Sequence, residues 1–300
     1  MKKLIALGFS LVTFVILSSP VLASHNSKDI DLTNYYFELL TFKANDEDKT
    51  YLEIYCQLPM QGFNFSKYEL SYQADYGIAV TLYNMFGNKI DWEFYHGSVT
   101  IENLEDINLL TPEVLKFPFL IAPGEYKIDI RITDLQNLED VRVGKDILIP
   151  DYKGPDLKLS DLQISHSISY SAEESLSVKN NWKIMPNASR VFGVENKAIY
   201  VYAEVYHLGF ANDSNKVIST TLTITNMDGI EVKTIKMDNK KFGNSTALVA
   251  KIPIYELAPG QYKLDMNVED LGSGREEAKS AYFYIDKPVF RFSSFRQPGK

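Results

Sequence analysis

One stretch of the sequence occurs twice, and this repeat limits the fold more than any other feature. Residues 122–135 read Ala-Pro-Gly-Glu-Tyr-Lys-Ile-Asp-Ile-Arg-Ile-Thr-Asp-Leu, and residues 258–271 keep eight of these fourteen residues in place, 136 positions later. Two further pairs of blocks recur in the same order: 80–87 with 222–229, and 53–55 with 204–206. Three blocks in one order predict two copies of one module.

The 300 residues suffice for two domains of ordinary size. A stretch with two prolines and a glycine, Ile149–Asp156, lies between the copies and marks the boundary. We therefore expect a first domain at residues 24–150, a linker at 151–156 and a second domain at 157–300. The aromatic share of 13% favours strands, where aromatic side chains pack well.

Each copy is predicted to be an all-β, immunoglobulin-like sandwich. Its blocks are short strands of period two separated by turn residues, with no long stretch of helical period. The dipeptides Pro123-Gly124 and Pro259-Gly260 predict type II turns, in which proline fixes φ and glycine takes a positive φ. A tyrosine follows each turn, Tyr126 or Tyr262, and such a tyrosine often braces this corner through its hydroxyl.

The first 23 residues are typical of a signal peptide. A basic start (Lys2 and Lys3) precedes the apolar run 4–17, and Val21-Leu22-Ala23 provides a cleavage site. We expect the protein to be exported to the periplasm or the extracellular space, without a membrane span after cleavage. The net charge of −8 argues against nucleic acid or an anionic membrane as the main partner.

Cys56 is the one cysteine of the sequence, so an intramolecular disulfide is impossible. It shares a strand face with Leu52, Ile54 and Leu58, which predicts a buried thiol. A nucleophile or an intermolecular disulfide would need an exposed Cys56. Each domain is therefore expected to be stable through its hydrophobic core.

Several blocks resemble a known family. They are the strand 51–58, the Pro-Gly-Glu-Tyr-Lys corner, the block 185–193 and the Tyr-rich strand 199–206. Together they resemble the N-terminal region of GWxTD-domain proteins, exported bacterial proteins of unestablished function. The resemblance covers most of residues 30–290 and implies a tandem β-sandwich. No Gly-Trp-x-Thr-Asp motif occurs in this sequence, so nothing that this motif does is carried over.

The sequence contains no recognisable catalytic or cofactor motif. Zinc spacings, the Gly-x-Ser-x-Gly elbow, phosphate-binding loops and the dinucleotide fingerprint do not occur. His207 follows a strand and is expected to cap its apolar face. Acidic side chains cluster in turns, and a calcium site would need several of them to converge. We expect solvated turn acids, no metal, no cofactor and no enzymatic activity.

The tyrosines give the candidate interaction surface. Tyr200, Tyr202 and Tyr206 share one face of a strand with Glu204, and Tyr51, Glu53 and Tyr55 repeat this arrangement in the first copy. Exposed tyrosine suits recognition, because it offers a large area and a hydroxyl. Alternatively, these faces are covered by long side chains or pack at the junction of the domains. Trp92 and Tyr95, with Phe94, form a second candidate platform.

Two classes of function remain open. The favoured one is a non-catalytic binding or scaffolding protein that acts through sandwich faces and loops on another envelope or secreted protein. The alternative is a carbohydrate-binding or carbohydrate-active protein with a loop-built site. In that case Trp92, Phe94 and Tyr95 would stack on sugar rings, and two carboxylates such as Glu102 and Asp106 would meet across a cleft. The sequence does not indicate an oligomeric state.

Overall fold

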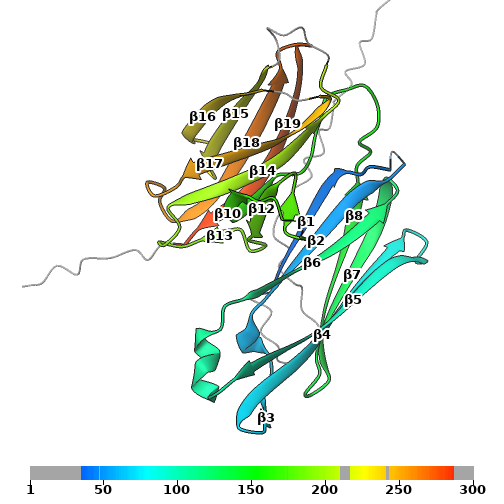
Figure 1. Ribbon diagram of the computed structural model, residues 1–300, viewed down its shortest axis with the longest axis vertical. Coiled ribbons are helices and arrows are strands. Elements are labelled where there is room, and N and C mark those ends of the chain that lie inside the picture. Colours follow the sequence, from blue (N-terminus) through cyan, green and yellow to red (C-terminus); the bar gives the residue numbers. More distant parts are fainter. Residues whose placement is uncertain (1–34, 47, 174, 210–216, 241–242, 287–300) are drawn as a thin grey trace, which may run out of the picture.

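A computed structural model describes residues 35–46, 48–173, 175–209, 217–240 and 243–286. The predicted signal peptide, residues 1–23, lies outside these residues. The described chain is built almost entirely of strands, arranged as two bodies joined by one crossing of the chain (Figure 1). The all-β prediction is confirmed.

Domain 1 contains the strands up to residue 149 and two short 3-10 helices. Its elements are β1 (Tyr36–Lys43), β2 (Thr50–Leu58), η2 (Met60–Gly62), β3 (Ser66–Tyr68), β4 (Ser71–Asn84), β5 (Lys89–Ile101), η3 (Leu104–Leu109), β6 (Glu113–Ile121), β7 (Gly124–Asp134) and β8 (Glu139–Ile149). One sheet has the order β1-β2-β6; the other contains β4-β7-β8, with β3 and β5 also paired to β4.

Domain 2 begins at residue 158 and repeats this plan with additions. Its strands are β9 (Lys158–Leu159), β10 (Gln163–Tyr170), β11 (Val178–Lys179), β12 (Trp182–Pro186), β13 (Val191–Phe192), β14 (Ala198–Tyr206), β15 (Val217–Asn226), β16 (Glu231–Lys240), β17 (Ser245–Pro253), β18 (Gly260–Asp270) and β19 (Arg275–Ile285). One sheet contains β11-β12-β10-β14-β17, and the other has the order β13-β19-β18-β15-β16.

The two domains share the strand order of an immunoglobulin-like sandwich. In each, the first, second and fifth main strands form one sheet (β1-β2-β6 and β10-β14-β17). The third, fourth, sixth and seventh form the other (β4, β5, β7, β8 and β15, β16, β18, β19). Domain 2 adds the hairpin β11-β12 to its first sheet and the short β13, which pairs in parallel with β19. Both domains are therefore immunoglobulin-like β-sandwiches.

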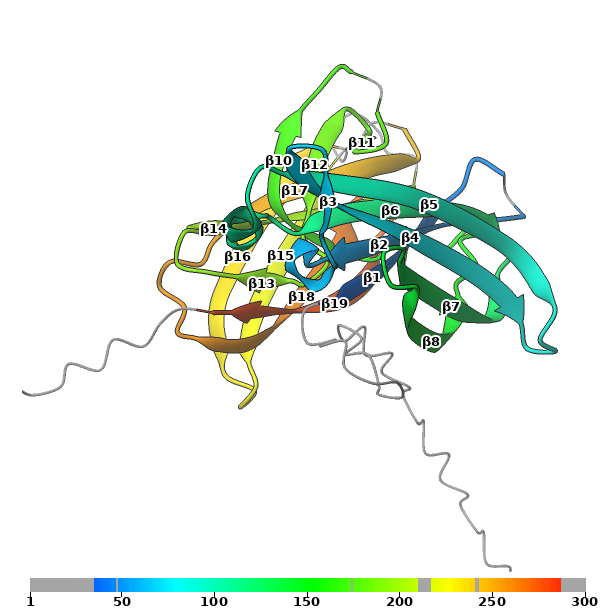
Figure 2. The ribbon, with the colours of Figure 1, turned by 90° about the horizontal axis from the view of Figure 1, so that it is seen from below.

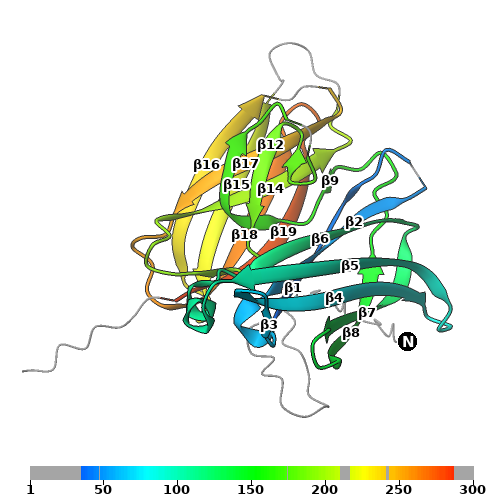
Figure 3. The same cartoon turned by 60° about the horizontal axis from the view of Figure 1, so that its bottom comes forward.

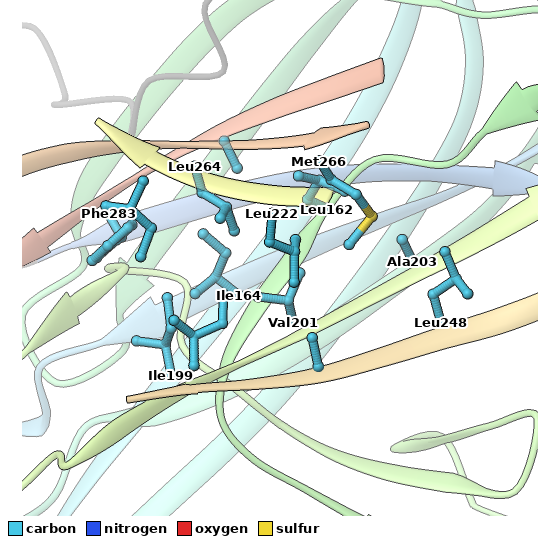
Figure 4. Close-up of a cluster of buried hydrophobic side chains, with 14 of the residues drawn as sticks. Leu162, Ile164, Ile199, Val201, Ala203, Leu222, Leu248, Leu264, Met266 and Phe283 are labelled. Atoms are coloured by element: carbon cyan, nitrogen blue, oxygen red, sulfur yellow. The ribbon is translucent and has the colours of Figure 1, made fainter. Parts of the chain in front are cut away.

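Each sandwich has its own core, because strand side chains alternate between a buried and an outward face. In β18 the alternate residues Leu264, Met266 and Val268 are buried, and they pack with β14 and β15 in the core of domain 2 (Figure 4). Domain 1 has a matching core that includes Cys56, which is fully buried as predicted. Burial raises the pKa of the Cys56 thiol, which keeps it protonated and unreactive.

The hairpins β4-β5 and β15-β16 agree in detail. Gly87 N donates to Asn84 O at 2.9 Å, and Gly229 N donates to Asn226 O at 3.1 Å. The two glycines have φ of +81° and +80°. Both hairpins also carry a register shift at the same place, next to Tyr83 in the first and next to Thr225 in the second. This agreement is consistent with the repeat of residues 80–87 at 222–229.

The Pro-Gly corners are only partly as predicted. Gly124 and Gly260 have φ of +148° and +145°, positive as expected but far from the value near +80° of a type II turn. Tyr262 donates from its hydroxyl to Ala258 O at 2.9 Å, which is the expected tyrosine brace. Tyr126 makes no such bond with any described residue. The brace is confirmed in domain 2 alone.

Candidate functional site

The two tyrosine faces found in the sequence pack against each other. The outward face of β2 and β1 in domain 1 meets the outward face of β14 in domain 2, in one mixed hydrophobic cluster. Its buried members come from both domains: Leu40, Phe42, Tyr55, Ile168, Ile184, Ala188 and Tyr202. We call this region the domain interface. The two sandwiches are packed against each other at this face.

A buried carboxylate lies at the centre of the domain interface. Glu53 on β2 is fully buried, and its Oε1 and Oε2 lie 2.5 Å from Lys116 Nζ and 2.7 Å from Lys179 Nζ. Lys116 belongs to domain 1, whereas Lys179 comes from the hairpin β11-β12 of domain 2. Tyr55 donates from its hydroxyl to the same Glu53 at 2.9 Å. One acid therefore joins the two domains.

The charges around Glu53 decide its ionisation. Burial by itself raises the pKa of Glu53, but the ammonium groups of Lys179 and Lys116 outweigh it and hold this pKa below its usual value. Lys179 Nζ also lies 3.8 Å from the ring centroid of Phe42 and 5.0 Å from that of Tyr202. Such cation–π contacts stabilise a desolvated ammonium group. The cluster therefore keeps its charges inside the protein.

A second buried ion pair crosses the domain interface. Arg190 Nε donates to Glu38 Oε1 at 2.7 Å, and both side chains are buried. Burial dominates over the charge of Arg190 here, so the pKa of Glu38 lies above its usual value. Glu38 and Glu53 therefore respond to their buried surroundings in opposite directions.

Glu204 of β14 occupies the place in domain 2 that Glu53 occupies in domain 1. Its carboxylate accepts hydrogen bonds from the hydroxyls of Tyr202 at 2.6 Å and Tyr206 at 2.7 Å. Asn180 Nδ2 also donates to it at 3.0 Å. Lys43 N of domain 1 donates to Tyr206 at 3.0 Å, so this network also reaches the other domain.

The predicted linker, residues 151–156, is held against both domains. Tyr152 is buried and donates from its hydroxyl to Thr41 O of domain 1 at 2.9 Å. His207 Nε2 lies 2.6 Å from Tyr152 O, which gives this histidine a position against the linker and not over an apolar strand face. Asp161 accepts hydrogen bonds from Thr41 N and Oγ1 at 2.8 and 2.6 Å. The connection between the domains is thus anchored on both sides.

These contacts correct the tyrosine surface expected from the sequence. Tyr202 and Tyr206 are buried in the domain interface and cannot form an exposed recognition surface in this structure. Tyr200 is half-buried at the edge of the same cluster, where Lys251 Nζ lies 5.6 Å from its ring centroid. Of the alternatives for these faces, the structure shows packing at the junction of the domains.

Trp92 and Tyr95 do not form one platform, because they lie three positions apart and strand faces alternate with a period of two. Trp92 and Phe94 lie on the outward face of the sheet, opposite Thr81 and Ala79 of β4. Tyr95 lies opposite the buried Ile78, on the other face. Trp92, Phe94 and Tyr95 are 53%, 55% and 37% exposed. The exposed platform therefore consists of Trp92 and Phe94.

The Phe94 ring covers a glycine of the neighbouring strand. Its Cε2 lies 3.2 Å from the position that a Cβ on Gly77 would occupy. Lys89 Nζ lies 5.0 Å from the centroid of the Trp92 ring. On the far side of β4, strand β7 presents Asp129 opposite Thr81. The platform is thus an aromatic strip at the edge of the sheet. Small side chains of β4 lie beside it, and charged side chains of β7 lie beyond β4.

The acids considered for catalysis lie on one short segment. Asp106 Oδ2 accepts a hydrogen bond from Asn103 N at 3.0 Å, as part of a capping box at the start of η3. Glu102 is exposed and close by in the sequence, so the two do not approach from opposite walls of a cleft. Within the described residues no three His, Cys, Asp or Glu side chains are grouped as a metal site.

No helix in the described part of the chain is long and apolar enough to cross a bilayer.

Sequence reasoning missed the ionic centre of the domain interface, although a signal was present. The pattern Tyr-x-Glu-x-Tyr occurs at residues 51–55 and again at 202–206. An acid between two tyrosines on a strand face, in both copies, indicates two similar faces that cover each other. The partner Lys179 carried no such signal, because it lies 126 positions from Glu53 in an added hairpin.

Comparisons with known proteins give distant structural likenesses. No protein-family model matches the sequence, and no curated protein is similar enough to count as a match. Dimeric latent PorU from Porphyromonas gingivalis is 10% identical at a TM-score of 0.29, over 84% of this chain and 20% of PorU. An immunoglobulin-like protein from Pseudomonas aeruginosa is 14% identical at a TM-score of 0.22, over 42% of this chain and 97% of that protein.

A β-glucuronidase from Parabacteroides merdae is 10% identical at a TM-score of 0.25, over 78% of this chain and 28% of the enzyme. This chain thus spans a small part of PorU and of the glucuronidase. Because all these scores are low, the assignment of the fold rests on strand order and register. Both domains are immunoglobulin-like sandwiches, and no family is assigned.

Proposed function

We propose that this protein is a non-catalytic, exported binding or scaffolding protein. Its two sandwiches form one rigid body, and the β5 side of domain 1 contacts another envelope or secreted protein. Two features support this proposal: the domain interface and the exposed aromatic strip of β5. The first 23 residues, which are typical of a signal peptide, support the proposed export.

The observation that carries the proposal is the uneven distribution of exposed aromatic side chains. The tyrosine faces of both domains are used inside the molecule, whereas residues 68–95 of domain 1 remain rich in exposed rings. These are Tyr68, Phe86, Trp92, Phe94 and Tyr95; in the described part of domain 2 the exposed rings are Tyr170, Tyr255 and Tyr284. Aromatic residues in exposed clusters are typical of protein contact surfaces.

Carbohydrate binding is the second candidate. It is favoured by one observation: Trp92 and Phe94 lie two residues apart on the same outward face, so both rings are offered to one ligand. Against it, Lys89 already lies over the Trp92 ring. The neighbouring Met85, Phe86 and Ile90 are exposed apolar groups that suit a protein better than a sugar.

The test compares the exported form, residues 24–300, with the double variant Trp92→Thr/Phe94→Lys. This variant copies the residues at the matching positions of domain 2, Thr234 and Lys236. Envelope and secreted proteins of the host are passed over both immobilised proteins and quantified by mass spectrometry. A protein retained by the wild type and lost with the variant is then purified, and its affinity for both forms is measured by calorimetry.

The proposal predicts at least a tenfold loss of affinity in the variant, with unchanged circular dichroism. The same two proteins are applied to a panel of soluble polysaccharides. Binding to a polysaccharide that disappears in the variant, without any variant-sensitive protein, would favour the second candidate. Hydrolysis of a polysaccharide by the wild type would contradict the non-catalytic assignment.

A further inference from the structure

β5 is an edge strand with a free side. It pairs along its length with β4, from the pair Ile101 and Tyr72 at one end to the pair Lys89 and Tyr83 at the other. No described strand pairs with its other side. The free side of such a strand presents N–H and C=O groups that can pair with another chain. With 13 residues, β5 is long for an edge strand. In Figures 2 and 3 the β4-β5 hairpin extends along domain 1, and its tip points away from domain 2.

Three other sheet edges in the described chain carry features that hinder pairing. β13 covers β19, with Val191 opposite Tyr284 and Phe192 opposite Ile285. β6 contains Pro118, which has no N–H to donate. β16 carries three lysines, at 233, 236 and 240, a common protection of edge strands. β5 instead carries Trp92 and Phe94 on its outward face.

Both faces of β5 are open. Residues 89–96 are all exposed. This includes the side chains on the outward face of the sheet and those on the face that, in the neighbouring strands, is turned toward the core. The facing sheet of domain 1 has three strands, β1-β2-β6, and leaves this part of β5 uncovered. An added strand at β5 could therefore place side chains next to both faces of the edge.

The two faces differ in chemistry. Trp92 and Phe94 make the outward face aromatic. On the other face Asp91 and Glu93 lie opposite the buried Leu82 and Val80, and neither forms an ion pair with any described residue. In an added strand, cross-strand neighbours of the aromatic pair would be apolar and those of the acids would be basic. The edge thus favours an added strand in which apolar and basic side chains alternate.

We propose that the free side of β5 binds an extended segment of a partner protein as an added β-strand, with apolar and basic side chains in alternation. This inference deepens the proposed function and rests on it. Main-chain hydrogen bonds would hold the segment, and the alternating side chains would select it. The two acids, which discourage pairing with an apolar strand, would favour a basic one.

A suitable probe can be taken from the sequence itself. Residues 288–297 read Pro-Val-Phe-Arg-Phe-Ser-Ser-Phe-Arg-Gln, which alternates aromatic and basic side chains at Phe290, Arg291 and Phe292. These residues lie outside the described part of the chain, and the segment serves here as a synthetic peptide. Its binding to residues 24–300 is measured by fluorescence anisotropy, and the protected amides are located by hydrogen exchange.

N-methylated peptides separate strand addition from side-chain contact. Successive N–H groups of a strand point to opposite sides, so one alternate set would face β5 and the other would face solvent. We expect N-methylation of one set to weaken binding at least tenfold and N-methylation of the other to change it less than twofold. Hydrogen exchange should slow at β5 amides. Equal effects of the two sets, or no binding of the parent peptide, would overturn the inference.

A charge exchange tests the selectivity. In the variant Asp91→Lys/Glu93→Lys, affinity for the arginine peptide should fall at least fivefold. A peptide with glutamate in place of Arg291, which in a strand lies on the face opposite to Phe290 and Phe292, should bind this variant more tightly than the wild type. If the charge exchange has no effect, the basic pattern is wrong. If partner capture still depends on Trp92 and Phe94 while all peptide tests fail, strand addition is wrong and the proposed function stands.

Discussion

The outermost strands β5 of domain 1 and β16 of domain 2 occupy the same place in the fold but are opposite in polarity. At matched positions β5 has Trp92 and Phe94 on the outward face, where β16 has Thr234 and Lys236. On the inward face β16 has Ile235 and Met237, which pack on the core of domain 2, and β5 has acids and a tyrosine. The same strand position therefore forms an edge protected by lysines in domain 2 and an aromatic edge in domain 1.

The faces that join the domains differ in a related way. Both present Tyr-x-Glu-x-Tyr, yet Glu53 forms ion pairs with two lysines, whereas Glu204 accepts hydrogen bonds from hydroxyl and amide groups. Where the copies agree, as in turns and cores, the residues serve the fold. Where they differ, they serve the contacts of one particular domain.

The largest effect is expected for Glu53→Gln. It would leave Lys116 and Lys179 buried without a carboxylate, and removing one partner of a buried ion pair costs about 3 to 5 kcal/mol. The counterpart Glu204→Gln keeps an acceptor for the tyrosine hydroxyls and should cost about 1 kcal/mol. Urea unfolding of both variants measures the difference. Equal losses of unfolding free energy in the two variants would show that Glu53 stabilises the protein no more than Glu204 does.

The stabilisation by Glu53 should depend on pH. Its pKa is lowered in the folded protein, so its contribution is present above the usual value of 4.5 and is lost as the pH falls through the lowered pKa. The gap in unfolding free energy between wild type and Glu53→Gln should therefore shrink on acidification below pH 4.5.

Glu38 provides the opposite control. Its pKa is raised by burial, so its contribution is present in acid and is lost as the pH rises through the raised pKa. Glu38→Gln should accordingly gain stability relative to the wild type as the pH rises from acid to neutral. If both variants change with pH in the same direction, the assigned surroundings of one acid are wrong.

A smaller effect is expected at Gly97. This residue of β5 lies opposite Tyr76, and a Cβ at Gly97 would come within 2.4 Å of Tyr76 Cζ. The hydroxyl of Tyr76 is hydrogen-bonded to Glu113 at the start of β6, so the ring cannot simply move aside. Gly97→Ala should destabilise by about 1 to 3 kcal/mol, as in overpacked cores.

The counterpart of Gly97 in domain 2 already carries a side chain. There Asn239 of β16 lies opposite Ile218 of β15. Asn239→Ala should therefore change the free energy of unfolding by less than about 1 kcal/mol. Thermal unfolding of both variants gives the comparison, and a neutral Gly97→Ala would mean that the Tyr76 ring is free to move.

The repeat and the period of two were sufficient to predict the repeated strands and the buried Cys56, because these depend on neighbours in sequence. The geometry of the Pro-Gly corners was predicted only in part. They did not predict what covers the tyrosine faces. Lys179 reaches Glu53 through a hairpin that domain 1 lacks, and Arg190 reaches Glu38 across 152 positions. Such contacts depend on how two finished domains pack. The grouping of Trp92 with Tyr95 was wrong for a local reason, since their faces alternate.

The smallest effect distinguishes the two Pro-Gly corners. Tyr262 donates to Ala258 O, whereas Tyr126 forms no hydrogen bond with a described residue. Tyr262→Phe removes one net hydrogen bond and should lower the free energy of unfolding by about 0.5 to 1.5 kcal/mol. Tyr126→Phe keeps the ring beside Gly124 and should have almost no effect. Urea unfolding measures the change in unfolding free energy for both variants, provided that the dependence of this free energy on urea concentration is unchanged. If the two variants are equally stable, the hydroxyl does not brace the corner, and the glycine φ values alone, +148° and +145°, set its shape in both domains.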